Sequence, residues 1–372
     1  MRIGYIVPGF PADERDWFTP AIADTIRCIR TRHDVRVITL RYPRETREYT
    51  VHGIPVIAVG DRGFTTLRRG LRRVLDEHQR RPFDLLHAFW ATEAGAVGAA
   101  AARRLDLPLV VTCAGGELVA REDLRYGDWR SLRARVLIRA ALNRADSIVV
   151  GSASQRALVA GRKAAWGTKT ACIPLGIDTE KFRPAPTGVQ IRTFTILSVA
   201  GLIPVKNHRM LFRALTRLRD RPWRLDLVGD GPLKEDLRAN ARSLGIVERL
   251  HWHGWVHHDE VAVYYQRADA FVTTSYHEAQ CVALLEGMAC GLPVVSTAVG
   301  LVPEVIESGV NGVCVPCEND EMLTEGLAMF LDRPERTVAA GEHSRFRALA
   351  YDRRLMVARL EEEYEKLSGG KA

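Results

Sequence analysis

The chain has 372 residues, 47% of them hydrophobic, and a formal net charge of +8. That length is too great for one ordinary core and predicts two domains, and the composition excludes wholesale disorder. No apolar run approaches the roughly 18 residues that span a bilayer. The first residues resemble a buried strand rather than a signal peptide, and an odd number of cysteines, seven, favours reduced thiols. A cytoplasmic protein is therefore expected.

Positive charge is concentrated in the first half of the chain. Residues 1–180 hold 29 Lys and Arg against 20 Asp and Glu, a balance of +9, and residues 181–372 hold 24 against 25, a balance of −1. This asymmetry predicts an anionic partner for the first domain. The Arg-rich stretches Leu67–Leu75 and Trp129–Arg144 contain few aromatic residues, which argues against nucleic acid. Peripheral membrane contact and solvated helix faces stand as equal interpretations.

Short apolar runs alternate with helical patterns through the first half. Helices are predicted over Thr19–Arg30 and Gly63–Gln79, where apolar residues recur with the 3.6-residue period. Buried strands are predicted at residues 2–9, 35–40, 54–59, 83–89, 107–113, 146–152 and 170–176. Such alternation is typical of a parallel, doubly wound sheet.

The alternation breaks near Thr179–Gln190, where prolines and a glycine predict a linker. The stretch Asp352–Leu367 predicts a closing helix. We expect two Rossmann-like α/β domains, residues 1–185 and 188–349, facing across a cleft, with residues 350–372 crossing back onto the first. Strands of the second domain are predicted at residues 194–201, 224–231, 249–255, 269–275, 292–297 and 311–316.

Ligands of such sheets bind beyond the C-terminal ends of the strands, so site residues are expected in the strand-to-helix turns. The first of these turns, Val7–Glu14, is not GxGxxG, and no suitable acidic residue follows a second strand. A dinucleotide-dependent dehydrogenase is therefore not expected.

Two glutamates, Glu278 and Glu286, stand in the otherwise apolar stretch Ser275–Val295. Burying a carboxylate is costly unless a partner pairs with it. Glu278 falls in a turn after a strand, and Glu286, in a helix predicted over Val282–Ala289, lies about two helical turns further on than Glu278. Backbone N–H groups at that helix start favour a diphosphate, and a carboxylate can accept two sugar hydroxyls. These glutamates are therefore either a solvated pair or ligand contacts, and the surrounding motifs favour ligand contacts.

Several motifs in chain order surround this pair. They are Pro174–Asp178 with Phe182, Val228–Leu233, Glu278–Glu286, Gly291–Val295, Gly300–Glu304 and Ser308–Gly312. The full set resembles the retaining family 4 glycosyltransferases of the GT-B fold, whose signature runs from an E-x7-E element through a G-L-P-V-V strand to a G-x-x-E turn.

The resemblance implies roles for individual residues. Glu286 would hold the ribose of a nucleoside-diphosphate-sugar, Glu278 the transferred sugar, and Lys206 the diphosphate, where its charge stabilises the leaving group. It also implies a metal-independent, front-face reaction with a hydroxyl acceptor and no resident cofactor, because the nucleotide-sugar is a co-substrate. Further donor-binding candidates are Ala279, Gln280, Cys281, Gly229 and Val256.

The chain departs from the family pattern at two places. Gly201 stands where the family usually has an arginine that clamps the phosphates, and Ala279–Cys281 replaces a G-F-G turn. Arg209 and Arg213 are candidate substitutes for that arginine. The departures keep open a non-catalytic nucleotide-sugar-binding protein. A nucleotide-sugar 2-epimerase is a second alternative, although Lys206 together with the two glutamates argues against it.

The first domain should receive the acceptor, which could be a glycan, a lipid or a small molecule. His87, at a predicted strand end, is a candidate catalytic and acceptor residue, with a packing role as the equal alternative. Gly115, Gly116 and Glu117 resemble the family's H-G-x-E turn, although Ala114 replaces its histidine. Gly9 and Phe10 are the remaining acceptor candidates.

No metal site is expected. Cys314–Cys317 is a lone CxxC without the second pair that zinc would need. The cluster His251–His258 lacks a carboxylate or cysteine at a usual ligand spacing, so a loop near the nucleotide base is the preferred interpretation.

Overall fold

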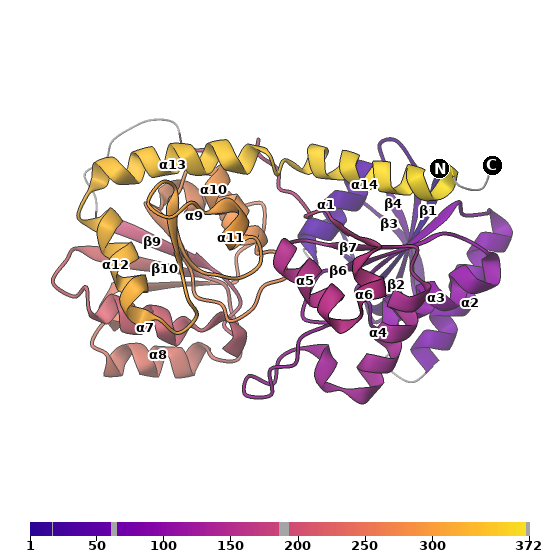
Figure 1. Ribbon diagram of the computed structural model, residues 1–372, viewed down its shortest axis with the longest axis horizontal. Helices are drawn as coiled ribbons and strands as arrows, with labels where there is room; N and C mark the ends of the chain where they lie inside the picture. The colour runs from indigo at the N-terminus through magenta and orange to yellow at the C-terminus, as the bar shows by residue number, and fades with distance from the viewer. Residues whose placement is uncertain (17, 61–64, 186–192, 370–372) are drawn as a thin grey trace. The chain divides into compact units, whose positions relative to one another are not determined.

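The computed structural model describes residues 1–16, 18–60, 65–185 and 193–369, and the chain forms two compact units. The first comprises Met1–Gly176 with Arg354–Ala372, and the second comprises Ile177–Arg353 (Figure 1). The division precedes the expected boundary at residue 185, because Ile177 donates its N–H to the Tyr351 carbonyl at 3.0 Å and Phe182 is fully buried in the second unit's core. Part of the expected linker, residues 186–190, lies outside the described residues.

The first unit is built on one sheet. Within the described residues its order is β3-β4-β2-β1-β5-β6-β7-β8, and its pairs are parallel except β3 with β4. The strands are β1 (Arg2–Gly9), β2 (Asp34–Tyr42), β3 (Arg47–Val51), β4 (Ile54–Ala58), β5 (Leu85–Phe89), β6 (Leu109–Cys113), β7 (Ser147–Val150) and β8 (Thr170–Cys172). The largely exposed β3 was not predicted, because it lacks the apolar run that marked the other strands.

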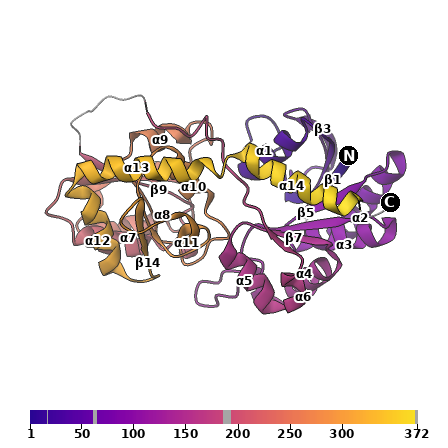
Figure 2. The same cartoon turned by 45° about the horizontal axis from the view of Figure 1, so that its top comes forward.

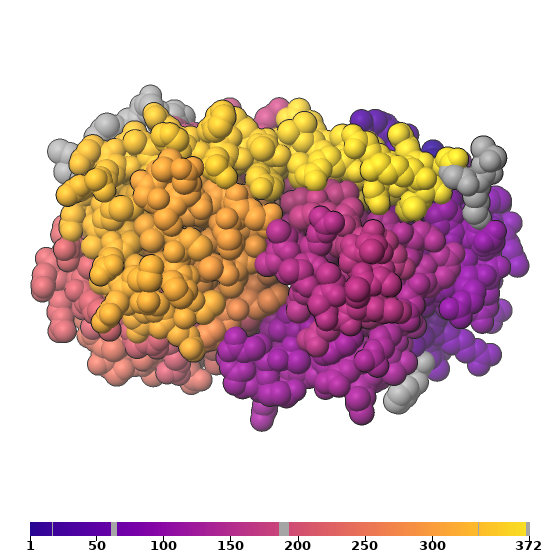
Figure 3. All heavy atoms as spheres, viewed as in Figure 1, coloured from indigo at the N-terminus to yellow at the C-terminus, as the bar shows by residue number. Residues whose placement is uncertain are grey.

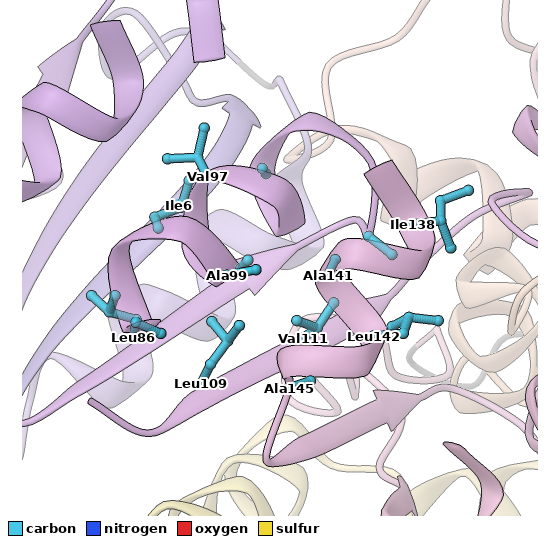
Figure 4. Close-up of a cluster of buried hydrophobic side chains, with 14 of the residues drawn as sticks. Ile6, Leu86, Val97, Ala99, Leu109, Val111, Ile138, Ala141, Leu142 and Ala145 are labelled. Atoms are coloured by element: carbon cyan, nitrogen blue, oxygen red, sulfur yellow. The ribbon is translucent and has the colours of Figure 1, made fainter. Parts of the chain in front are cut away.

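Helices cover both faces of this sheet because neighbouring strand residues point to opposite sides. Ile6 of β1 joins the core under α3 and α4, whereas Tyr5 and Val7 join the core under α1 and α14. Figure 4 shows Val97 and Ala99 of α3 and, on α4, Ile138, Ala141 and Leu142 gathered in the first of these cores. The helices are α1 (Pro20–Ile29), α2 (Thr65–Arg80), α3 (Glu93–Leu105), the 3-10 turn Asp128–Arg130, α4 (Leu132–Arg144), α5 (Ala153–Arg162), α6 (Ala164–Gly167) and α14 (Arg353–Ser368).

The C-terminal helix α14 is part of the first unit although it lies at the other end of the sequence (Figure 3). Its Tyr364 is fully buried, and its hydroxyl lies 2.6 Å from Nδ1 of His87 and 3.1 Å from the Tyr5 hydroxyl. Its Glu363 accepts a hydrogen bond from Ser147 at 2.7 Å. The helix is thus anchored to β1, β5 and β7.

The second unit contains a parallel sheet with the order β11-β10-β9-β12-β13-β14 in the described residues. In chain order this is 3-2-1-4-5-6, the order of doubly wound nucleotide-binding folds. The strands are β9 (Phe194–Val199), β10 (Trp223–Val228), β11 (Leu250–Gly254), β12 (Ala270–Thr273), β13 (Val294–Thr297) and β14 (Gly312–Val315).

Two apolar cores cover the faces of this second sheet. Ile196 of β9 joins the core under α7, α8 and α12, and the next residue, Leu197, joins the core under α9, α10 and α11. Helix α13 packs on α10 (Figure 2). The helices are the 3-10 turns Pro204–Lys206 and Val247–Arg249, with α7 (His208–Thr216), α8 (Lys234–Ser243), α9 (Val261–Arg267), α10 (Val282–Ala289), α11 (Val302–Val305), α12 (Asp320–Leu331) and α13 (Pro334–Leu349).

The predicted fold class, two Rossmann-like α/β domains, is confirmed. In the described part of the chain, no helix combines the length and the apolar character that crossing a bilayer requires.

Tyr364→Phe tests the anchoring of α14. The change removes the hydroxyl that contacts His87 and Tyr5, so a buried ring nitrogen loses its partner, which should lower the free energy of unfolding by about 1–3 kcal/mol. Urea denaturation measures it. Tyr264→Phe, at a half-buried tyrosine of α9, should change stability by less than about 0.5 kcal/mol. Equal effects of the two substitutions would contradict the anchoring role.

Candidate functional site

The second sheet reverses its strand order between β9 and β12, which are neighbours. Ligands of open α/β sheets bind outside the C-terminal ends of the strands at such a switch point. The segment after β9 carries Gly201 and Lys206, and the segment after β12 carries Ser275 and Glu278. The topology therefore brings the predicted cation and the first predicted carboxylate to one place.

Hydrogen bonds hold these two segments together. Tyr276 donates its N–H to the Val205 carbonyl at 2.8 Å, and the Thr274 hydroxyl donates to the carbonyls of Lys206 at 3.1 Å and Asn207 at 3.0 Å. These bonds fix the backbone around Lys206 against the turn that contains Glu278.

Lys206 and Glu278 form an ion pair at this junction. Nζ of Lys206 lies 2.5 Å from Oε1 of Glu278, and the Ser275 hydroxyl donates to the same oxygen at 2.6 Å. The side chains are 23% and 13% exposed, so both charges are largely removed from water yet reachable by a ligand. Burial also lowers the pKa of the neighbouring His277, which favours its neutral form. The pair presents one cation and one hydrogen-bond acceptor side by side.

Glu286 lies on the buried side of α10, with 5% of its surface exposed. Its Oε1 accepts a hydrogen bond from Nε2 of His258 at 3.0 Å, and its Oε2 accepts one from the Tyr265 hydroxyl at 3.0 Å. Burial, with the nearby carboxylate, raises the pKa of Tyr265 well above its ordinary value, so this hydroxyl stays a donor. An ionised carboxylate offers about four acceptor positions, so each oxygen can accept a further hydroxyl.

The turn between Glu278 and α10 is closely packed. Ala279, Gln280 and Cys281 are each 7% exposed. Cys281 has a φ of 70° where α10 begins, and burial raises the pKa of its thiol to about 12, so the sulfur is a neutral packing group. Gly300, with a φ of 55°, permits the close approach of its segment, since a Cβ there would lie 2.8 Å from the Gln280 carbonyl.

The remaining donor-binding candidates follow neighbouring strands of the same sheet edge. Gly229, after β10, has a φ of 134° and donates its N–H to the Gly254 carbonyl at 2.7 Å. Val256, after β11, is half-buried against the core that contains Tyr265. The segments after β9, β10, β11 and β12 thus all meet at this edge.

The backbone does not require a glycine at position 201. Its φ is not in the left-handed region, and a Cβ there would meet only the Asp230 carbonyl oxygen, at 3.8 Å. Of the two candidate substitutes for an arginine at this position, Arg209 is exposed on α7, and Arg213 forms a two-point ion pair with Asp320. Arg213 is therefore committed to α12.

His87 is placed in the interior of the first unit. It is 0% exposed, its Nδ1 contacts the Tyr364 hydroxyl, and its Nε2 lies 2.7 Å from the Thr112 hydroxyl. Burial lowers its pKa to about 3, so the ring is neutral in the physiological range. These contacts support the packing interpretation of His87 and do not support contact with an acceptor.

Phe10 and Gly9 are also enclosed. Phe10 is 0% exposed and belongs to the core beneath α1. The ring of Phe18 lies over Gly9, so closely that a Cβ on Gly9 would meet it at 2.2 Å, and it stacks on Tyr42 with ring centroids 4.6 Å apart. Phe18 is 37% exposed. Among the described residues of this turn, Phe18 therefore offers accessible aromatic surface, and it was not one of the acceptor candidates.

The Glu117 side chain forms hydrogen bonds within its own turn. It is 0% exposed, and its carboxylate accepts the N–H groups of Ala114 at 3.1 Å and Gly115 at 2.8 Å. Burial raises its pKa to about 7 despite these hydrogen bonds. The ring of Tyr126 lies against Gly116. Glu117 therefore shapes the turn that contains the two glycines rather than pointing outward from it.

Three residues at the second sheet's edge were missed by the sequence analysis: Ser275, His258 and Tyr265. Ser275 lies two residues after β12, in the segment that leads to Glu278, so its position was a usable signal. His258 belongs to the cluster that was assigned to a loop near the nucleotide base, but its contact with Glu286, like that of Tyr265, arises only through folding.

A Rossmann-like sheet with a cation and carboxylates at its switch point is the arrangement of a nucleotide-binding domain. Residues 19–176 match the model of the glycosyl transferase 4-like domain, and residues 181–347 match that of the glycosyl transferases group 1. The chain belongs to the family 4 glycosyltransferases.

Known relatives agree with this assignment. The D-inositol 3-phosphate glycosyltransferase of Kineococcus radiotolerans is 29% identical over 311 residues, covering 76% of this chain and 71% of that protein. The GDP-mannose-dependent alpha-(1-6)-phosphatidylinositol monomannoside mannosyltransferase of Mycolicibacterium smegmatis is 29% identical over 305 residues, covering 76% of each. Sucrose-phosphate synthase from Thermosynechococcus elongatus shares the fold, with a TM-score of 0.86, 20% identity and full coverage of both chains.

Alanine substitutions at two glycines of this edge should have opposite outcomes. Gly201→Ala should leave the free energy of unfolding within about 0.5 kcal/mol of wild type, because the site is open. Gly229→Ala should lower it by more than about 1 kcal/mol, because the φ is unfavourable and the Cβ would lie 2.0 Å from the Ala200 carbonyl oxygen. Thermal and urea denaturation measure both. A large loss at Gly201 would show that the backbone, not the ligand, requires that glycine.

Proposed function

We propose that this glycosyltransferase moves a sugar from a nucleoside-diphosphate-sugar to a hydroxyl acceptor, with retention at the anomeric carbon. The Lys206–Glu278 ion pair at the switch point of the second sheet carries the proposal. Glu286 lies on α10, which follows the turn that contains Glu278, and its carboxylate accepts hydrogen bonds from His258 and Tyr265. In this assignment Lys206 binds the diphosphate, Glu278 a hydroxyl of the transferred sugar, and Glu286 the ribose.

The proposed reaction exchanges one bond for another on the same face of the sugar. The bond between the anomeric carbon and the phosphate oxygen breaks, and its electron pair stays on that oxygen. The acceptor hydroxyl oxygen then bonds to the anomeric carbon, and its proton passes to the departing phosphate oxygen. A fixed cation beside the oxygen that gains charge lowers the barrier. Lys206 would supply that cation, so the proposal needs no metal ion for this step.

Glu278 has a second task in this assignment. Its bond to Lys206 holds the ammonium before the donor arrives, and the Ser275 hydroxyl keeps one carboxylate oxygen in place. A preorganised group of this kind avoids reorganisation when the reaction begins. When the diphosphate binds, Lys206 can share its three N–H donors between the phosphate and Glu278.

Lys206→Ala tests the leaving-group assignment. We expect kcat to fall about 10²–10³-fold, as when one charge-stabilising donor is removed from other active sites. Wild type should be stabilised by one of ADP, GDP or UDP, since a ligand at a hundred times its Kd adds about 2.7 kcal/mol, and the variant should lose that thermal shift. Arg221→Ala, which breaks a 2.6 Å pair with Asp332 in the same unit, is the control and should keep both properties, because Arg221 precedes β10 and so lies at the other end of that strand.

The products and the ligand response separate the alternatives. A transferase consumes the acceptor and releases nucleoside diphosphate, whereas an epimerase changes the sugar without a transferred product. A sensor would bind the donor but show no turnover with any acceptor, and Lys206→Ala would weaken binding alone. If no nucleotide shifts the melting of wild type, the donor assignment is wrong.

A lipid acceptor at an anionic membrane is the acceptor class that we propose. The name of the Mycolicibacterium relative describes action on a phosphatidylinositol mannoside. On α4, Leu132 and Val136 are 75% and 64% exposed and stand one turn apart, with Arg133 and Arg139 exposed beside them. The other side of α4 is buried on the sheet (Figure 4). Exposed aliphatic side chains among arginines suit the surface of an anionic bilayer.

Replacing Leu132 and Val136 together by serine should reduce sedimentation of the protein with phosphatidylglycerol vesicles several-fold. Wild type should bind these vesicles better than phosphatidylcholine vesicles, and less at high salt, because charge contributes to binding. Val338→Ser, at a 66% exposed valine of α13, is the matched control and should bind as wild type does. If wild type does not bind anionic vesicles at low salt, the membrane proposal is wrong, and the assignment of the donor site is unaffected.

A further inference from the structure

A series of side-chain contacts that begins in the first segment of the second unit holds the Glu286 carboxylate from one side. His258 contacts Oε1 of Glu286 through Nε2, and Nδ1 of the same ring lies 3.3 Å from Nζ of Lys181. Lys181 also contacts Asp259 at 2.9 Å. The order of contacts is therefore Lys181 to His258 to Glu286.

This order determines the tautomer of His258. A lysine ammonium can only donate hydrogen bonds, so Nδ1 of His258 must accept. In the neutral ring the hydrogen then resides on Nε2, where it points at Oε1 of Glu286. In general, the hydrogen bond that one ring nitrogen of a histidine makes sets whether the other nitrogen is protonated.

Packing fixes the same groups sterically. Phe182, beside Lys181 in sequence, is fully buried, and its ring centroid lies 5.7 Å from that of His258 and 5.8 Å from that of Tyr265. Tyr265 donates to the second oxygen of Glu286. Phe182 therefore contacts both of the rings, His258 and Tyr265, that orient the two Glu286 oxygens.

We propose that Lys181, His258 and Tyr265 are positioning residues that hold the Glu286 carboxylate in the orientation that receives the ribose hydroxyls. The proposal rests on the donor assignment above and adds how the carboxylate is oriented. Each donor occupies one acceptor position of an oxygen and leaves another for a hydroxyl. A carboxylate that is already oriented loses less side-chain entropy on binding. The segment that enters the second unit thereby supports the ribose site through Lys181 and Phe182.

A comparison of ligands isolates this role. The probes are UDP, GDP and ADP, the 2′,3′-dideoxy counterpart of whichever binds, and pyrophosphate, with Kd measured by calorimetry. His258→Ala should weaken binding of the ribonucleotide about tenfold and leave the Kd values of the dideoxy ligand and pyrophosphate unchanged. Lys181→Met and Tyr265→Phe should produce the same selective loss to a smaller degree. His258→Gln, which keeps a side-chain N–H, should recover part of it.

His251→Ala, at an exposed histidine of β11, is the control and should bind all probes as wild type does. Equal weakening of the ribose and dideoxy ligands by His258→Ala and by Lys181→Met would show a general structural role and overturn the inference. If wild type binds a nucleotide but does not prefer the ribose form, the assignment of Glu286 itself fails. If wild type binds no nucleotide, the proposed function is wrong, and the positioning role that rests on it is overturned with it.

Discussion

The cost of burying two carboxylates governs the arrangement of the second sheet's C-terminal edge. Glu286 is 5% exposed, and the Glu278 side chain is 13% exposed. Unpaired buried charges are too costly to persist, so each must have donors. Those donors come from separate segments: Lys206 after β9, His258 after β11 and Ser275 after β12. Because both carboxylates need hydrogen-bond donors, segments that lie far apart in the sequence meet around them.

Local pattern was sufficient for the strands that carry the site and insufficient for their partners. The runs that end at Val199 and Thr273 are apolar and bounded by polar turns, and parallel pairing then brings their ends to one edge. The turn residues Lys206 and Glu278 could therefore be placed from sequence. Their direct contact could not, because it depends on the hydrogen bonds of Thr274 and Tyr276 across the two segments.

The first unit shows where sequence reasoning reached its limit. His87 belongs to β5, whose residues are buried throughout, and the group that satisfies its Nδ1 is Tyr364, far along the chain. The residues near His87 in the sequence therefore do not indicate its contact with Tyr364. The same holds for β3, which is held by antiparallel pairing to β4 and largely exposed. Phe10 and Glu117 lie at the sheet edge as expected, but their side chains turn into the core and into the turn itself.

Gly201 affects the charge balance of the site, because it leaves this position without a cation. The backbone would accept a side chain at this position, so the absence of a cation there is a property of the site and not of the fold. Lys206 is already paired with Glu278, and Arg213 with Asp320. In the proposed function, a diphosphate would add negative charge beside a carboxylate, so backbone N–H dipoles at the start of α10 would contribute to its binding. Under the same proposal, a correctly oriented ribose contact would supply more of the donor's binding, which connects Gly201 to the support of Glu286 by His258.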